Sequence, residues 1–166
     1  MKTSTASGSS KRSRRPAIEL RVTGRLLAAA LALNCANVWA LDFQSVSEAG
    51  AVMYDSPSTS GRKLFVVSRG YPVEVIVTLE NWAKVRDAGG TISWIEKKAL
   101  SGKRMVLVLS AAANVHQSPV ANSPVVFKAE RDVVLEFIEP GPPGWIKVKH
   151  REGQSGFILA SEVWGR

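Results

Sequence analysis

Cysteine is almost missing from this sequence. Cys35 is the only one among 166 residues, and it lies in an apolar N-terminal segment. If that segment is removed after synthesis, no cysteine remains. The rest of the chain then has no disulfide, no thiol nucleophile and no cysteine-based metal site. Side-chain packing must therefore supply the stability that disulfides give to many small exported proteins.

Catalytic and metal-binding motifs are also lacking. The two histidines, His116 and His150, have no second ligand at a spacing that suits a metal ion. None of the serines lies in a G-x-S-x-G motif. A glycosidase-like pair of carboxylates could form, but a small chain with many acids brings some pair together by chance; the acids considered are Glu74, Asp87, Glu136 and Glu152. We therefore expect no catalytic residue, no metal site and no cofactor.

Positive charge is distributed unevenly along the chain. The formal net charge of +8 would on its own favour a polyanionic partner. Residues 1–40 contain seven basic side chains and one acidic one, which gives this segment +6. The other 126 residues hold 15 basic and 13 acidic side chains, or +2. Nucleic-acid binding by the folded part is therefore not predicted.

The N-terminal segment has the pattern of an export signal. A basic region ends at Arg25, and the apolar run LLAAALALNCANVWA follows at 26–40. This run is too short to span a bilayer comfortably, and Val38 and Ala40 suit positions −3 and −1 of a cleavage site. We expect a signal peptide over residues 1–40, cleaved after Ala40, and a periplasmic mature protein without a stable membrane span. An uncleaved N-terminal anchor is the alternative.

The remaining sequence contains one pattern twice. MYDSPSTS at 53–60 aligns with VHQSPVAN at 115–122, an offset of 62 residues. NWAKVRDAGGTISWI at 81–95 aligns with GWIKVKHREGQSGFI at 144–158, an offset of 63. A repeat of this length indicates two copies of one structural unit.

Each copy is expected to be a small all-β unit. Residues 73–79 alternate with a period of two, and segments rich in proline and glycine mark turns. EKKAL at 96–100 and LASEVW at 159–164 could each add one turn of 3₁₀ helix. The strand pattern predicts two small barrels or sandwiches, over residues 41–102 and 103–166, packed at a fixed angle because the linker between them is short.

Several motifs occur in a characteristic order: Ser-Pro after the first strand, NWAKVRDAGGTISWI, LSGKR and the terminal VWG. Over residues 43–166 this order resembles the tandem bacterial SH3-like (SH3b) domains of cell-envelope proteins. The resemblance implies two tandem small SH3-like β-barrels that act as envelope-associated binding modules, and it identifies no ligand. The family usually has glycine before the second aromatic residue. Here the first copy has Ser93-Trp94, and the second keeps Gly156 but has Phe157.

Aromatic residues beside basic ones mark the candidate binding faces. In WAKVR, Trp82, Lys84 and Arg86 should share one strand face, with Ala83 and Val85 on the other. WIKVK repeats this arrangement around Trp145. Cross-strand pairing should then bring Trp82 close to Trp94, and Trp145 close to Phe157. The candidate ligand-binding residues are Tyr54, Trp82, Lys84, Arg86, Trp94, Trp145 and Phe157, with Tyr71 as a further candidate for the rim.

Rings flanked by cations have two interpretations. In a ligand groove, the rings stack on sugars or receive peptide side chains, and the cations meet carboxylates. Alternatively, the rings cover the mouth of a barrel or join the two units.

The sequence therefore favours a non-enzymatic periplasmic module that binds a cell-envelope component. The component would be a peptidoglycan stem peptide or an extended segment of an envelope protein. The alternative is a structural or regulatory subunit whose barrels only mediate protein assembly. An envelope hydrolase is disfavoured, because the sequence has neither a recognisable nucleophile nor a metal site.

Overall fold

The computed structural model describes residues 42–166. The expected signal peptide, its cleavage after Ala40 and Cys35 lie outside the described residues. None of the helices in residues 42–166 is long and apolar enough to cross a membrane.

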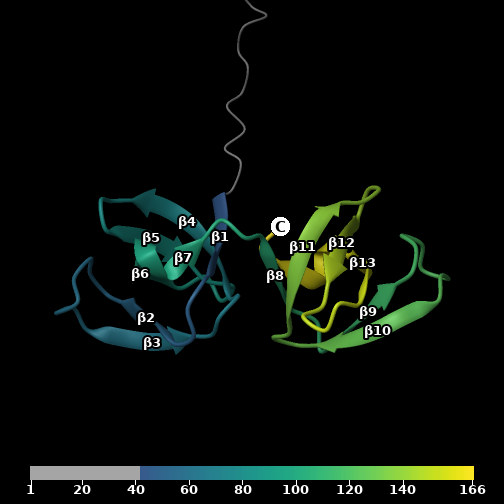
Figure 1. The fold of residues 1–166 in the computed structure, drawn as a ribbon, viewed down its shortest axis with the longest axis horizontal. Helices are drawn as coiled ribbons and strands as arrows, with labels where there is room; N and C mark the ends of the chain where they lie inside the picture. Colours follow the sequence, from purple (N-terminus) through teal and green to yellow (C-terminus); the bar gives the residue numbers. More distant parts are fainter. Residues whose placement is uncertain (1–41) are drawn as a thin grey trace, which may run out of the picture. The chain divides into compact units, whose positions relative to one another are not determined.

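Seven strands and one 3₁₀ turn form the first repeat (Figure 1). They are β1 (Asp42–Val46), β2 (Ala51–Tyr54), β3 (Lys63–Val67), β4 (Pro72–Thr78), β5 (Trp82–Arg86), β6 (Ile92–Glu96), the 3₁₀ turn η2 (Lys97–Ala99) and β7 (Leu100–Ser101). The expected 3₁₀ turn near residues 96–100 is confirmed.

The second repeat follows the same plan. It consists of β8 (Met105–Val108), β9 (Ala112–His116), β10 (Val125–Glu130), β11 (Val134–Pro140), β12 (Trp145–Lys149), β13 (Ser155–Leu159), the 3₁₀ turn η3 (Ala160–Glu162) and β14 (Val163–Trp164). Here too the 3₁₀ turn lies where the sequence placed it.

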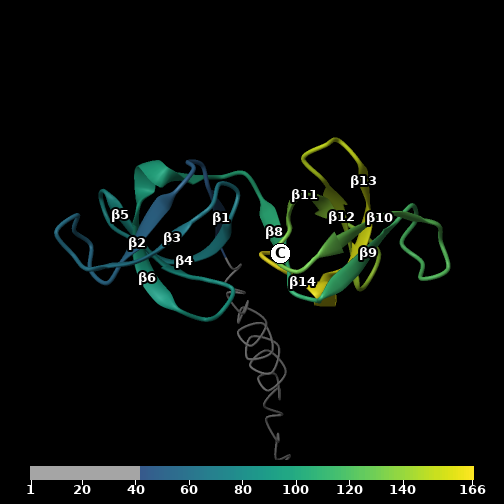
Figure 2. The same cartoon turned by 90° about the horizontal axis from the view of Figure 1, so that it is seen from below.

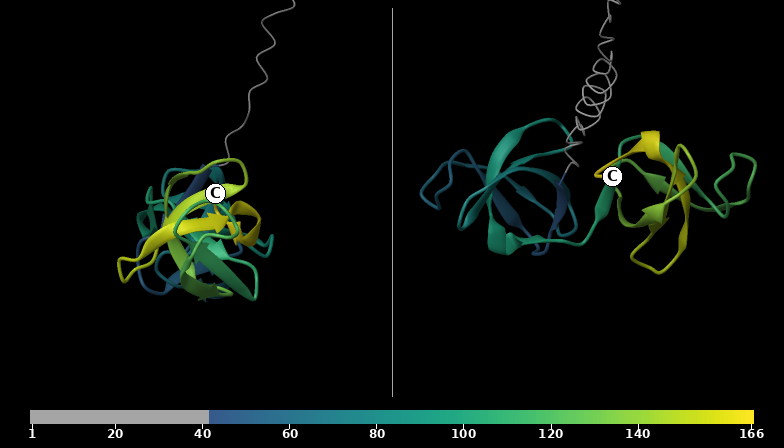
Figure 3. Two further views of the ribbon diagram at one scale, coloured as in Figure 1. Left: turned by 90° about the vertical axis from the view of Figure 1, so that its right-hand side faces the viewer. Right: turned by 90° about the horizontal axis from the view of Figure 1, so that it is seen from above.

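Each repeat forms its own antiparallel sheet, and the two sheets share no strand (Figures 2 and 3). The hydrogen-bonded order is β3-β2-β6-β5-β4-β1-β7 in the first and β10-β9-β13-β12-β11-β8-β14 in the second. The orders are identical when each strand is replaced by its counterpart. Within residues 42–166, no pairing joins the two end strands of either sheet. The structure thus shows two β-sheets, one per repeat, and closure into barrels stays a prediction.

The predicted alternation of β5 and β12 decides which residues enter the two cores. Ala83 and Val85 of β5 are at most 1% exposed, whereas Trp82 and Lys84 are only partly buried. In β12, Ile146 and Val148 take the corresponding inward positions. The outward face of each strand is thereby left to Trp and Lys, as the sequence indicated.

A β-bulge interrupts strand pairing at the same place in both repeats. The register shifts between Val75 and Val77 in β4, and between Phe137 and Glu139 in β11. A bulge adds one residue to one strand and re-aims the side chains that follow it. After the bulge, Val77 pairs with Lys84, whereas Glu139 pairs with Lys147.

One aromatic contact joins the repeats. The rings of Phe43 in β1 and Trp164 in β14 meet edge to face, with centroids 5.0 Å apart and an interplanar angle of 86°. The described residues belong to one compact unit, Ala40–Arg166. Neither ring of this contact is among the candidate ligand-binding residues.

Candidate binding faces

The first candidate face is formed by β5 and β6. Lys84 pairs directly with Trp94 across the hairpin, and Trp94 also pairs with Tyr54 of β2. The Lys84 ammonium nitrogen lies 5.8 Å from the centroid of the Trp94 ring. This is within the range in which a cation is attracted to the negative face of an aromatic ring. Lys84 and Trp94 therefore form one outward-facing cation–aromatic pair.

The expected pairing of Trp82 with Trp94 is wrong. The β5–β6 hairpin pairs Arg86 with Ile92, so its register brings Trp94 opposite Lys84 and Trp82 opposite Glu96. The Trp82 ring instead meets Tyr54 edge to face, with centroids 5.4 Å apart and an interplanar angle of 89°.

Of the two candidate tyrosines, Tyr54 is buried and Tyr71 is partly buried. Tyr54 is only 7% exposed, so it packs against the Trp82 ring and offers little surface to a ligand. Tyr71 packs against the apolar core of the first repeat. Burial raises the pKa of the Tyr71 hydroxyl, and the negative charges of Asp87 and Asp132 add to this effect.

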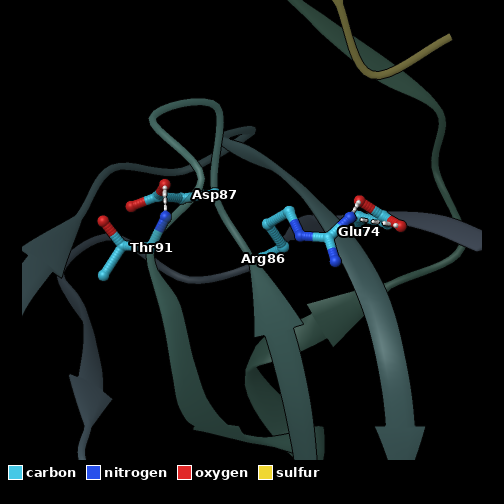
Figure 4. A network of polar contacts seen from close by, with 4 residues as sticks. All are labelled: Glu74, Arg86, Asp87 and Thr91. Atoms are coloured by element: carbon cyan, nitrogen blue, oxygen red, sulfur yellow. Dashed lines mark hydrogen bonds and ion pairs between the residues drawn. The ribbon is translucent and has the colours of Figure 1, made fainter.

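Arg86 is engaged within the protein. Its Nη1 donates to both carboxylate oxygens of Glu74, at 3.2 Å and 2.9 Å (Figure 4). The Glu74 side chain is 12% exposed and that of Arg86 is 44% exposed. In the adjacent turn, Asp87 accepts a hydrogen bond of 2.8 Å from the backbone N–H of Thr91. Of the two predicted cations on this strand, Arg86 thus stabilises a buried carboxylate.

The second repeat has a matching face in which some of the residues differ. Lys147 pairs with Phe157, and its ammonium nitrogen lies 5.9 Å from the centroid of that ring. Trp145 meets His116 edge to face, with centroids 5.6 Å apart. His116 therefore occupies the place of Tyr54, and its Nδ1 lies 2.8 Å from the carbonyl oxygen of Ser123. The sequence analysis did not assign His116 to the face, although the 62-residue offset aligns it with Tyr54.

The two lysines differ in their charged neighbours. The Lys147 ammonium donates to Glu139 Oε1 at 3.0 Å. Among residues 42–166, no carboxylate oxygen lies within 4.0 Å of the Lys84 ammonium. The cation of the first face is therefore open, and that of the second is partly neutralised by the protein itself.

A second difference lies beside each outer aromatic ring. Ser93 of β6 is 1% exposed, and its hydroxyl has no hydrogen-bond partner among the described residues. Its counterpart is Gly156 of β13. A Cβ atom at Gly156 would lie 2.5 Å from the carbonyl oxygen of His116 and 2.8 Å from Val115 Cγ1. Strands β13 and β9 thus approach so closely that only glycine fits there without a shift.

A hollow of about 780 Å³ lies apart from both aromatic faces. Its lining includes Arg69, Lys103, His150 and Arg151, and none of the seven candidate ligand-binding residues. Lys103 is already paired with Glu136, at 2.9 Å. The sequence pattern does not predict this hollow, because its lining comes from segments that are far apart in the chain. Within the described part of the chain, no group of three or more His, Cys, Asp or Glu side chains is arranged to hold a metal ion.

Solved structures that are similar to this chain include three of low sequence identity. NlpC1 from Trichomonas vaginalis has 17% identity and a TM-score of 0.35, and the match covers 78% of this chain and 48% of that one. NlpC2 from the same organism has 14% identity and a TM-score of 0.34, with 76% and 49% covered. An NlpC/P60 family protein from Bacillus cereus ATCC 10987 has 14% identity and a TM-score of 0.35, with 74% and 55% covered. The chain thus spans about half the length of these proteins.

The comparison with protein families gives a clearer result. No curated protein matches the chain significantly. The family described as bacterial SH3 domain matches twice, at residues 47–102 and 110–165. Each match falls on one of the two sheets and includes its aromatic face. The chain therefore belongs to the bacterial SH3 domain family and carries two copies of the domain in tandem.

Proposed function

We propose that this protein is a non-enzymatic, exported binding module with two SH3-like barrels that holds an extended peptide of the cell envelope. The observation that carries the proposal is the pair formed by Lys84 and the partly exposed ring of Trp94, with its counterpart at Lys147 and Phe157. The peptide is a peptidoglycan stem peptide or an extended segment of an envelope protein. The basic and apolar pattern of residues 1–40 supports a periplasmic localisation.

The chemistry of the pair suits such a ligand. A flat indole ring contributes large contact area at a low cost in side-chain entropy, and aromatic residues dominate binding energy at many interfaces. The adjacent ammonium pairs with a carboxylate of the ligand. Stem peptides combine small apolar side chains with free carboxylates, so one end meets the ring and the other meets Lys84.

The alternative is a subunit whose domains only mediate assembly. It gains support because Trp82 and Trp145 pack edge to face against Tyr54 and His116 of their own domains, which leaves less of these two rings for a ligand. Trp94 has no such aromatic contact among the described residues, so it discriminates between the two functions.

The test compares Trp94→Ala with Trp82→Ala. We expect Trp94→Ala to weaken retention on insoluble peptidoglycan at least about tenfold, since an aromatic anchor contributes about 2 kcal/mol or more. Its melting temperature should stay within about 3 °C of wild type, because the ring lies outside the core cluster. Trp82→Ala should lower the melting temperature more, because it removes the ring that covers Tyr54.

Val66→Ala is the matched control, since Val66 lies on β3 and is 62% exposed. It should change neither property. A parallel arm replaces peptidoglycan with a periplasmic extract and separates the two sources of peptide. If wild type is retained in neither arm, or if Trp94→Ala lowers stability as strongly as Trp82→Ala, the assembly subunit replaces the binding module.

A further inference from the structure

The inference starts from one substitution between the repeats. Val77 and Glu139 occupy the same position, directly after the bulge in β4 and in β11, and each pairs with the lysine of its own face. Val77 offers an apolar side chain to Lys84. Glu139 offers a carboxylate, and the Lys147 ammonium donates to it at 3.0 Å.

Glu139 therefore shows what the lysine of such a face binds. Both lysine ammonium groups keep nearly the same distance from their rings, 5.8 Å and 5.9 Å. The carboxylate of Glu139 thus binds Lys147 without removing it from the face of Phe157. A carboxylate from outside the protein could meet Lys84 with the same geometry, because Val77 brings no charge and is 44% exposed.

Two carboxylates on strands next to β5 are already paired with other cations. Arg86, on the same strand, holds Glu74. Glu96, on the neighbouring strand, forms an ion pair with Lys98 at 3.1 Å. Neither Glu74 nor Glu96 therefore neutralises Lys84. A carboxylate-bearing ligand is thus electrostatically complementary to the first face.

We propose that Lys84 and Trp94 form a carboxylate-binding subsite, and that the residue after the bulge decides whether each repeat is open to an anionic ligand. Val77 leaves the first repeat open. In the second repeat, Glu139 binds Lys147 from within the protein, so this lysine does not bind the same ligand. The inference rests on the proposed function, since it names the ligand chemistry and the asymmetry of the two binding faces.

The test exchanges charge at these two positions in the protein expressed from the full 166-residue sequence. The probe is insoluble peptidoglycan, used either untreated or with its carboxyl groups converted to amides. We expect wild type to be retained on the untreated material and about tenfold less on the amidated material. Val77→Glu should weaken retention on untreated peptidoglycan to a similar extent, because the new carboxylate occupies Lys84.

Val77→Gln is the matched control for Val77→Glu, because glutamine has nearly the shape of glutamate without its charge. Retention of this variant on untreated peptidoglycan should stay close to that of wild type. Glu139→Gln should increase retention by at least about twofold, because a second open face adds to the first. Thermal unfolding of each variant checks that the fold is intact, and both positions are exposed enough to tolerate the change.

The outcomes separate this inference from the proposed function. If wild type is retained neither on untreated peptidoglycan nor by the periplasmic extract, the proposed function fails and this inference fails with it. If wild type is retained by the extract alone, the proposed function stands and this inference fails. If wild type is retained but binds amidated peptidoglycan equally well, or if Val77→Glu and Val77→Gln behave alike, binding stands and the carboxylate subsite is overturned. If Glu139→Gln leaves retention unchanged, the second repeat is not closed by Glu139 and the asymmetry is overturned.

Discussion

The two repeats share one strand order and one pattern of inward residues, but they use different chemistry at four matched positions. Tyr54, Val77, Ser93 and Trp94 in the first repeat correspond to His116, Glu139, Gly156 and Phe157 in the second. All four lie on or beside the aromatic face. Both repeats thus keep one strand plan, while these four residues of the aromatic faces differ between them.

The repeats also pair their matched acidic residues with cations from different positions. Glu74 of the first repeat is bound by Arg86, the residue opposite it in the sheet. Glu136 of the second repeat faces Lys149 in the sheet but forms its ion pair with Lys103. A conserved strand register thus does not fix which cation a carboxylate uses, and variants can show what each arrangement contributes.

The largest expected effect comes from exchanging the residues at the close strand contact. Gly156→Ser would place a Cβ atom 2.5 Å from the carbonyl oxygen of His116. The strands must separate, and overpacking of this kind costs about 1 to 3 kcal/mol or more. Urea denaturation should therefore show a reduction of about 3 kcal/mol in the free energy of unfolding.

The reverse exchange, Ser93→Gly, is the control. This change removes a buried hydroxyl that has no hydrogen-bond partner in the described part of the chain, which raises the free energy of unfolding. It also adds backbone freedom to the unfolded chain, which lowers that free energy. The net change should stay within about 1 kcal/mol. Equal losses in the two variants would mean that the repeats do not differ in strand spacing at this position.

A smaller effect is expected from the ion pairs. Arg86→Ala leaves the carboxylate of Glu74, 12% exposed, without its cation. Because Arg86 itself is partly solvated, we expect a loss of about 1 to 2 kcal/mol rather than the larger cost of a fully buried pair. Lys149→Ala removes the matched residue of the second repeat, where Glu136 keeps Lys103. Its effect should stay within about 0.5 kcal/mol, and urea denaturation of both variants checks the difference.

The sequence predicted the repeat, the β-rich fold, the inward residues of β5 and β12, and both 3₁₀ turns. These depend on periodicity and internal similarity, which a single sequence contains. It did not predict the pairing of Trp94 correctly. A slip of two residues between strands keeps every side chain on its own face, so alternation alone cannot distinguish Lys84 from Trp82 as the partner. The register is determined by the turn after Arg86.

Two further features were not accessible from the pattern. The bulge that brings Val77 and Glu139 opposite the lysines interrupts strands for which a period of two predicts unbroken alternation. The burial of Tyr54 depends on its edge-to-face contact with Trp82 from another strand. The sequence thus identified the residues of the candidate faces but not their partners.

The smallest expected effect concerns pH and Glu162 of the 3₁₀ turn η3. Burial raises the pKa of the Glu162 carboxyl above its ordinary value of 4.5, and the charge of His116 opposes the rise. The matched residue of the first repeat is the buried Ala99, which does not titrate. A raised pKa in the folded state means that folding favours the protonated carboxyl. Stability from this group is therefore present below about pH 4.5 and is lost as the pH rises through the raised value.

The free energy of unfolding of Glu162→Gln should equal that of wild type in acid and exceed it at neutral pH. The difference should be less than about 1 kcal/mol, because the side chain is partly solvated. Urea denaturation of both proteins at the two pH values measures the difference, and a gap that stays constant between acid and neutral pH would show that Glu162 does not titrate differently on folding.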